Sequence, residues 1–219
     1  GPGKLDYKIF ATSDVARFDK LVFRGNYNDG WSHSKFPSNI DNQTTLACYI
    51  RDPLTRALRR EMGDLAGHDA WCMVYLNGEP WGLYNTTERY DDNWLKDYTG
   101  KTDWDLIGIS DVGATGNDKD PLPHGADEVK EGDAAAWQSF VTAYVTNGTN
   151  ANPSGLTGNA YLAAVQNHID IENFTNYMIL NIWNGNCDWP HHNAFVARER
   201  TAGAKWIFID WDTESAYGG

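Results

Sequence analysis

The sequence predicts an α+β fold in a single domain over residues 1–219, and three observations support this prediction. The chain of 219 residues shows no break in composition, as expected of one domain. About residues 1–110 mix strand and helix patterns, which indicates a small, strand-rich mixed lobe. About residues 111–219 carry helix patterns and end in a hairpin with polar loops, which indicates a helical part.

The mixed lobe is expected to begin with a short strand and a helix. Residues 20–24 (KLVFR) are typical of a strand. Asp52 is a favourable N-cap, Pro53 suits the first helical position, and Gly63 follows the expected end. An apolar stripe at helical spacing is made up of Ile50, Leu54, Ala57, Leu58 and Met62. Four arginines fall off this stripe: Arg51, Arg56, Arg59 and Arg60.

A β-hairpin is expected next. Residues 71–76 and 81–84 are apolar and aromatic, and Asn77-Gly78 between them is a strong hairpin signal. We expect the hairpin to end near Glu88. A short helix over residues 91–98 and a strand over 103–109 then follow, separated by Gly100. Asp91, Asp92 and Asn93 are residue types that bind calcium, but without the order of an EF-hand loop they are expected to cap this helix instead.

The helical part is expected to start after a surface loop. Residues 110–132 are rich in Gly, Asp and Pro, and a short strand could lie among them. Asp133 is expected to cap a helix that carries Trp137. A polar linker at 147–158 then leads to a helix over 160–166.

The last segment combines a helix, a polar loop and a hairpin. Asp170 is expected to cap a helix whose apolar residues cover most of its circumference, so this helix should be buried. The polar loop 184–193 follows it. Residues 194–196 and 205–209 are expected to pair as strands across a turn, and Asp210-Trp211-Asp212 come directly after them.

Charge and composition limit the classes of function. The formal net charge of −12 argues against nucleic-acid binding, which needs clustered Lys and Arg. It suits a basic protein substrate, and a nucleotide can still bind if divalent metals bridge carboxylates to phosphates. The three cysteines form no CxxC pair, so neither a zinc site nor a disulfide framework is indicated. No apolar run of about 18 residues exists to span a membrane.

The polar residues of the last segment could carry phosphoryl transfer. Asp188 and Asn193 lie five residues apart in the loop, and Asp212 follows the hairpin. Protein kinases place an Asp, four residues, an Asn, and later a second metal-binding Asp in this order. There the first Asp orients or deprotonates the attacking hydroxyl, and the other two side chains hold Mg²⁺ against the phosphates.

Other interpretations of these segments stay open. Asp188-Trp189-Pro190 has the composition of a simple turn. His191 and His192 are zinc-type ligands, but no third spaced ligand accompanies them. Six tryptophans could serve either the core or an aromatic platform for sugars: Trp31, Trp71, Trp81, Trp94, Trp104 and Trp189.

The chain resembles proteins of the CotH family, which are related to the protein-kinase fold. Several segments carry the resemblance in the same order: residues 18–25, residues 49–52, the hairpin at 74–78 with 81–85 and Glu88-Arg89, residues 186–190 with His192-Asn193, and Trp211-Asp212. The resemblance implies an atypical protein-kinase-like fold with a small mixed lobe and a helical lobe. It also implies transfer of phosphate from ATP, with Mg²⁺ or Mn²⁺, to Ser or Thr of a protein.

The resemblance assigns roles to five residues. Asp188 becomes the catalytic Asp, Asn193 and Asp212 become metal ligands, and Arg24 and Glu88 become nucleotide-binding residues. For Arg24 and Glu88 a structural ion pair is an equal alternative. A bacterial extracellular or cell-surface protein is the expected setting.

The chain also departs from the family. The upstream Gly/Ser-rich stretch and phosphate-binding Lys have no clear counterpart, with Lys4 and Lys8 as candidates by proximity alone. The helical region beyond Trp-Asp is missing as well, so the chain is expected to be either a domain truncated at both ends or a minimal version. The alternative function is a non-catalytic binding or structural module, carbohydrate- or surface-associated, that keeps the fold.

Overall fold

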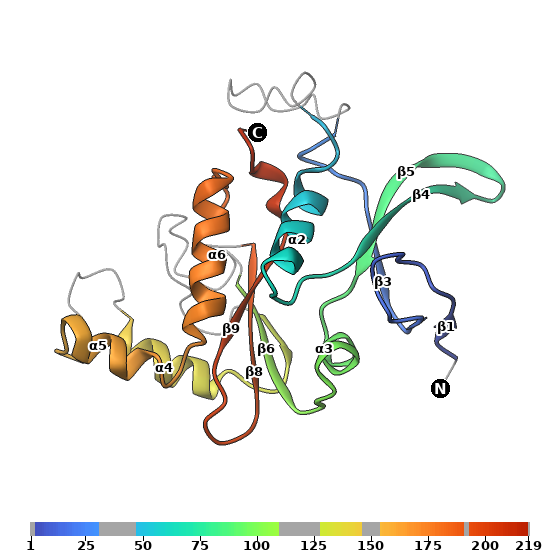
Figure 1. Cartoon of the computed structure of the whole chain (residues 1–219). Coiled ribbons are helices and arrows are strands. Elements are labelled where there is room, and N and C mark those ends of the chain that lie inside the picture. Colours follow the sequence, from blue (N-terminus) through green and yellow to red (C-terminus); the bar gives the residue numbers. More distant parts are fainter. Residues whose placement is uncertain (1–2, 31–46, 110–127, 146–153, 191–192, 219) are drawn as a thin grey trace.

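The computed structural model describes residues 3–30, 47–109, 128–145, 154–190 and 193–218 (Figure 1). Within these residues the fold is α+β, as predicted, with five α-helices and antiparallel sheets. Most of the expected loop at 110–132, most of the expected linker at 147–158, His191, His192 and Trp31 lie outside the described residues. No helix in the described part is long and apolar enough to cross a membrane.

The first sheet has three antiparallel strands in the order β3 (Leu21–Arg24), β5 (Glu79–Glu88) and β4 (Asp69–Leu76). The expected hairpin is confirmed, because Asn77 and Gly78 both adopt positive φ, as the tightest hairpin turns require. Its tip projects away from the rest of the chain (Figure 1). The short pair β1 (Leu5–Asp6) and β2 (Arg17–Phe18) was not predicted.

The second sheet has four antiparallel strands in the order β7 (Glu128–Glu131), β6 (Trp104–Ile109), β8 (Ala194–Glu199) and β9 (Ile207–Asp210). β7 is the short strand that the sequence left open within the loop expected at residues 110–132. All six residues of β6 are buried. β6 precedes the lobe boundary expected near residue 110 but pairs with β8 beyond it, so this sheet joins the two expected parts.

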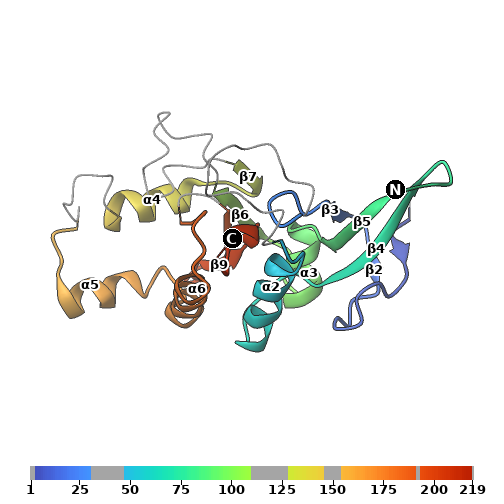
Figure 2. The same ribbon diagram turned by 90° about the horizontal axis from the view of Figure 1, so that it is seen from above.

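Four helices follow the expected spacing. They are α3 (Asp92–Thr99), α4 (Ala135–Tyr144), α5 (Gly158–Val165) and α6 (Ile171–Trp183). The Asp91 carboxylate accepts from the Trp94 amide at 3.0 Å, and Asp170 accepts from the Asn173 amide at 3.1 Å. These two N-caps are therefore confirmed. The cap expected at Asp133 is wrong, because Ala134 takes the N-cap position of α4 without a side-chain hydrogen bond. Viewed from above, α4 and α5 lie at the opposite end of the molecule from the β4–β5 hairpin (Figure 2).

The prediction of a fully buried α6 is wrong for its exposed face. Ile179, Ile182 and Trp183 are 55–69% exposed, whereas Tyr177 and Leu180 are buried. The helix packs against β9 and α2, so these two contacts set its buried side.

The expected N-cap at Asp52 is also wrong. Helix α2 (Arg51–Glu61) begins two residues before the expected first position at Pro53, and Ile50 takes the cap position without a side-chain hydrogen bond. Asp52 lies inside the helix because its carboxylate is engaged elsewhere. Its Oδ1 accepts from both the amide and the hydroxyl of Thr213, each at 3.1 Å.

The polar face of α2 is the buried one. Ile50 is 50% and Leu54 38% exposed, although an apolar stripe normally faces the core. The residues of α2 that are at most 3% exposed are Arg51, Asp52, Thr55, Arg56 and Arg59. The reason is that carboxylates from other segments, Asp29, Asp69 and Asp210, lie against this face and pair with its arginines, which offsets the cost of burying charge.

Leu54→Gln is therefore expected to change the free energy of unfolding by less than about 1 kcal/mol, as is usual for a surface substitution. Chemical denaturation of both proteins measures the difference. A loss of about 3 kcal/mol would show that the apolar stripe, not the polar face, is packed.

Candidate functional site

The β8–β9 hairpin brings the two candidate metal ligands to one end. Ala194 pairs with Asp210 in the register, so Asn193 before β8 and Asp212 after β9 leave the same end of the hairpin. Asn193 and Asp212 adopt left-handed backbone conformations, with φ of 61° and 54°. Asn and Asp tolerate this region better than other non-Gly residues, and such residues cluster at functional sites.

Asp188 and Asn193 contact each other directly. The Asn193 amide donates from Nδ2 to Asp188 Oδ2 at 2.8 Å. A relay of amides ties this loop to the sheet: the Asp188 N–H donates to Asn186 at 3.3 Å, and Asn186 donates to Asn181 at 2.9 Å. Asn181 in turn donates to Asp210 at 2.6 Å. The loop is thus positioned from both α6 and β9.

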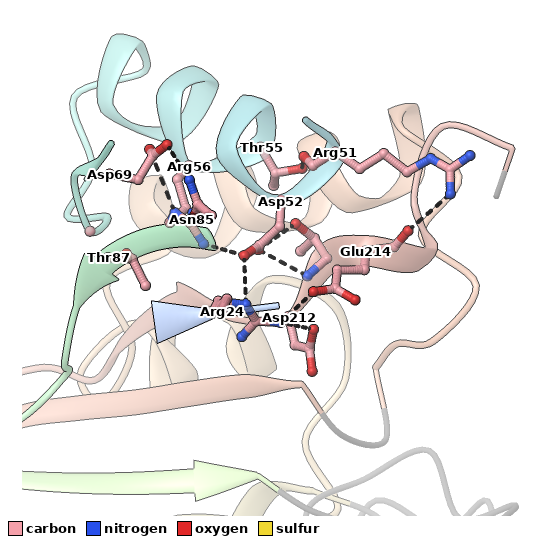
Figure 3. Close-up of polar contacts among 12 residues, drawn as sticks. Arg24, Arg51, Asp52, Thr55, Arg56, Asp69, Asn85, Thr87, Asp212 and Glu214 are labelled. Carbon is pink, nitrogen blue, oxygen red and sulfur yellow. Dashed lines mark hydrogen bonds and ion pairs between the residues drawn. The ribbon is translucent and has the colours of Figure 1, made fainter. Parts of the chain in front are cut away.

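Arg24 links the first sheet to the segment after β9. Its guanidinium pairs with Asp212 and with Glu214, the latter at 2.9 Å, and its Nε lies 3.5 Å from Asp52 (Figure 3). It also lies over the Trp211 ring, 5.1 Å from the centroid. The structure therefore shows the ion-pair alternative for Arg24. The phosphate contact expected of Arg24 stays a prediction.

A buried network surrounds this contact. Asp52 also pairs with Arg56, and Arg56 donates to Asn85 at 2.7 Å (Figure 3). Asn85 donates to Asp69 at 3.1 Å. Four carboxylates pair with Arg24 and Arg56: Asp52, Asp69, Asp212 and Glu214.

The electrostatics favour an added cation at Asp212. Burial raises the pKa of Asp212 to about 6, and the neighbouring carboxylates of Glu214 and Asp52 add to this, whereas Arg24 opposes it. One oxygen accepts from Arg24. The other makes no hydrogen bond or ion pair within the described residues, and the side chain is 32% exposed. Asp212 therefore keeps one oxygen open to solvent or a ligand.

Arg59 and Asp210 form a second buried ion pair behind the site. The Arg59 Nε lies 2.9 Å from Asp210, and its Nη1 lies 2.8 Å from Asp64. Burial raises the pKa of Asp210 to about 6 although Arg59 lowers it. Asp210 is thus held by Arg59 and Asn181 inside the fold, and the metal role expected of Asp212 stays a prediction.

Glu88 lies in a separate network at the junction of β5 and α3. Its carboxylate accepts from the His68 amide at 2.8 Å, from Trp94 Nε1 at 3.2 Å and from the Tyr98 hydroxyl at 2.7 Å. Burial raises its pKa. Among the described contacts, none joins Glu88 to Asp188, Asn193, Asp212 or Arg24. Its nucleotide role stays a prediction.

A cavity of about 260 Å³ opens beside Asn193 and between the two sheets. Val22 of β3 lines it from one side, and strands of the second sheet line it from the other. Arg89, Lys130 and Trp211 also border it. Sequence reasoning noted Arg89 only as part of a motif and missed Lys130, because nothing in the sequence around β7 signals its approach to Asn193. Lys4, the candidate by proximity, instead lies 4.0 Å from Asp97.

The residues fit a partly protein-bound magnesium ion. The described residues contain no cluster of three or more His, Cys, Asp or Glu side chains that could enclose a metal. Mg²⁺, however, commonly takes one or two protein oxygens and completes its shell with water and substrate phosphates. One open carboxylate oxygen at Asp212 and an amide oxygen at Asn193 are ligands of that kind.

Comparison with known proteins gives the family. No curated protein matches the chain. A family model described as "CotH kinase protein" matches residues 11–219, which includes every candidate site residue. The chain belongs to the CotH kinase protein family.

Proposed function

We propose that this chain is a kinase-like phosphoryl transferase that uses ATP and a divalent metal to phosphorylate Ser or Thr of a protein substrate. The observation that carries the proposal is the contact of Asp188 with Asn193 at the end of the hairpin that also carries Asp212. These are the residue types, in the order, that protein kinases use. A kinase-like fold is part of the proposal, with the cavity between the sheets as the nucleotide pocket.

Each residue has a distinct task in this proposal. Asp188 orients the attacking hydroxyl and accepts its proton. Asn193 and Asp212 would hold Mg²⁺ or Mn²⁺, which neutralises charge on the phosphates when bound. Arg89 and Lys130 border the pocket and supply positive charge for the phosphates. Arg24 holds Asp212 in place.

The acceptor protein is proposed to be basic. The net charge of −12 attracts positively charged partners and accelerates their encounter. Because the exposed charges are screened by salt, this attraction should weaken as ionic strength rises.

Thermal melting with ATP tests the proposal. At pH 7.5, above the pKa of about 6 at Asp212, we expect ATP with Mg²⁺ or Mn²⁺ to raise the melting temperature. A ligand at a hundredfold excess over its dissociation constant adds about 2.7 kcal/mol of stability. ATP with EDTA should give no rise, and Asp212→Asn should remove the rise seen with metal.

Asp103→Asn is the matched control, because Asp103 is 70% exposed and remote from the hairpin end that carries Asn193. It should keep the metal-dependent rise. If the wild type shows no rise with either metal, or if Asp212→Asn keeps the full rise, the nucleotide site is placed wrongly.

A second candidate function is a carbohydrate- or surface-binding module. Trp81 is 63% and Trp71 37% exposed on the β4–β5 hairpin, whereas Trp94 and Trp104 belong to the core. Exposed aromatic rings favour stacking partners. Glycan binding that is indifferent to ATP and metal, and that Trp81→Ala removes, would support this function over the kinase.

A further inference from the structure

The outer edge of strand β4 is open. β4 pairs with β5 on one side, and within the described part of the chain no strand pairs with its other side. β4 has eight residues, whereas the other outer strands of the two main sheets, β3, β7 and β9, have four each. The β4–β5 hairpin lies at one end of the molecule (Figure 2). β4 is therefore the longest open edge among the described strands.

Three residues of β4 direct their backbone groups to this open edge. Just before the strand, the Glu88 N–H donates to the His68 carbonyl at 3.4 Å, and hydrogen-bonded pairs alternate along an antiparallel ladder. Every second residue counted from His68 therefore bonds to β5, whereas Trp71, Met73 and Tyr75 present N–H and C=O groups outward. The irregularity before Tyr75 leaves this pattern intact, because its extra residue lies in β5. These outward groups select an extended strand as the partner.

The same three residues carry exposed apolar side chains. Trp71 is 37%, Met73 51% and Tyr75 60% exposed. They lie on one face of the sheet, because side chains alternate along a strand. β4 contains no Lys or Pro, and its one charged residue is the first, Asp69. The edge therefore lacks the charges and prolines that usually protect an open strand from pairing.

We propose that β4 pairs antiparallel with β4 of a second copy of this chain, around a two-fold axis at Met73. This register sets Met73 opposite its own copy and Trp71 opposite Tyr75, so the outward backbone groups pair and aromatic rings meet across the strands. A slip by two residues would set Tyr75 opposite Asp69, or Trp71 opposite the turn residue Asn77. The two copies then share one six-stranded sheet in the order β3-β5-β4-β4-β5-β3.

The register also brings opposite charges together. Glu79 at the hairpin tip falls opposite Gly67 of the second copy, and the Gly67 carbonyl accepts from Arg60. Arg56 and Arg59 pair with carboxylates of their own chain, whereas neither Arg60 nor Glu79 forms an ion pair within the described residues. The two-fold axis makes this contact twice, although each chain carries a net charge of −12. This complementarity favours a second copy over an unrelated strand.

The inference is independent of the proposed kinase activity. None of the five residues assigned to the candidate site belongs to β4. A chain without phosphoryl-transfer activity could therefore still form this dimer, and a monomeric chain could still bind ATP. The two proposals fail separately.

Sedimentation equilibrium of the whole chain at pH 7.5 tests the pairing. We expect a dimer that dissociates on dilution within about 1–100 µM. Met73→Lys sets two like charges opposite each other and should weaken association at least tenfold. Met73→Pro removes an outward N–H while the bonds to β5 remain, and should weaken it as strongly. Ile182→Lys is the control, because Ile182 is 66% exposed on α6, and it should change the dissociation constant by less than about twofold.

The charge contact and the register have their own tests. Glu79→Lys should weaken association about 3- to 10-fold, and the effect should shrink as ionic strength rises. Met73→Cys places two thiols beside the axis, since paired Cα atoms lie about 5.5 Å apart. A short bis-maleimide should link the two copies through position 73, as mapped by mass spectrometry. Ile182→Cys gives the background of non-specific linking.

Three results would overturn the proposal. The first is a wild-type chain that stays monomeric at about 100 µM, as expected if the hairpin binds a glycan or an unrelated strand instead. The second is a dimer that Ile182→Lys dissociates and Met73→Lys does not. The third is cross-linking of Met73→Cys no greater than that of Ile182→Cys. If Met73→Pro does not melt cooperatively, the lysine and cysteine variants decide.

Discussion

Asp52→Asn is expected to lower the free energy of unfolding by about 3–5 kcal/mol, the cost of removing one partner from a buried ion pair. Asp52 is 2% exposed and lies between Arg24 and Arg56. Asparagine keeps the shape but removes one counter-charge from each guanidinium group, so Arg56 keeps only Asp69, at 3.9 Å, among its described carboxylate partners. Urea denaturation at pH 7 measures the loss.

The pH of this measurement follows from the pKa of Asp52. Burial would raise this pKa, but Arg56 and Arg24 outweigh burial and hold it below its ordinary value. A lowered carboxyl pKa contributes stability that is fully present at pH 7 and is lost as the pH falls through the folded-state pKa. Asp6→Asn is the control, since Asp6 is 76% exposed, and should change stability by less than about 0.5 kcal/mol. Equal effects in the two variants would contradict the buried network.

Asp188→Asn is expected to lower the rate of phosphoryl transfer by about 10²–10⁴-fold, the usual contribution of a general base. Nucleotide binding should stay within about twofold, because asparagine still accepts the 2.8 Å hydrogen bond from Asn193. Transfer is measured with labelled ATP and basic Ser/Thr-containing proteins, and binding by the metal-dependent melt.

The two measurements separate the roles of the aspartates. Asp212→Asn should lose binding and transfer together, whereas Asp188→Asn should lose transfer alone. An Asp188→Asn protein that transfers phosphate at the wild-type rate would remove Asp188 from the catalytic role. Loss of metal-dependent nucleotide binding in the Asp188→Asn variant would make Asp188 a metal ligand instead.

The predictions that succeeded depend on short-range signals. Asn77-Gly78 marks a hairpin because the turn needs two adjacent residues with positive φ, and Asn and Gly are the residue types that adopt it most readily. Asp91 and Asp170 cap helices through amides three residues ahead. Such contacts are decided locally, so no knowledge of the rest of the chain is needed.

The predictions that failed depend on partners far along the chain. Asp52 resembles an N-cap in its own segment, but its carboxylate bonds to Thr213. The polar face of α2 is buried because Arg59 meets Asp210, a residue that helix periodicity cannot reveal. Sequence patterns assign polar residues to solvent by default, and buried ion-pair networks violate that default.

The sequence could predict only part of the candidate site, because some of its residues meet only through contacts between distant segments. Asp188, Asn193 and Asp212 stand out because their order along the chain is informative. Lys130 does not, because its place beside Asn193 depends on how β7 pairs with β6. The contact of Arg24 with Asp212 spans nearly the whole chain and emerges only from the fold.

The pairing of early arginines with late carboxylates has a consequence for biosynthesis. Arg24 and Arg59 leave the ribosome long before Glu214 and Asp210, which complete their ion pairs. Until then Arg24 has only Asp52, and Arg59 only Asp64, as a carboxylate partner among the described ion pairs. The polar face of α2 therefore cannot reach its final set of ion pairs before residues 210–214 are synthesised.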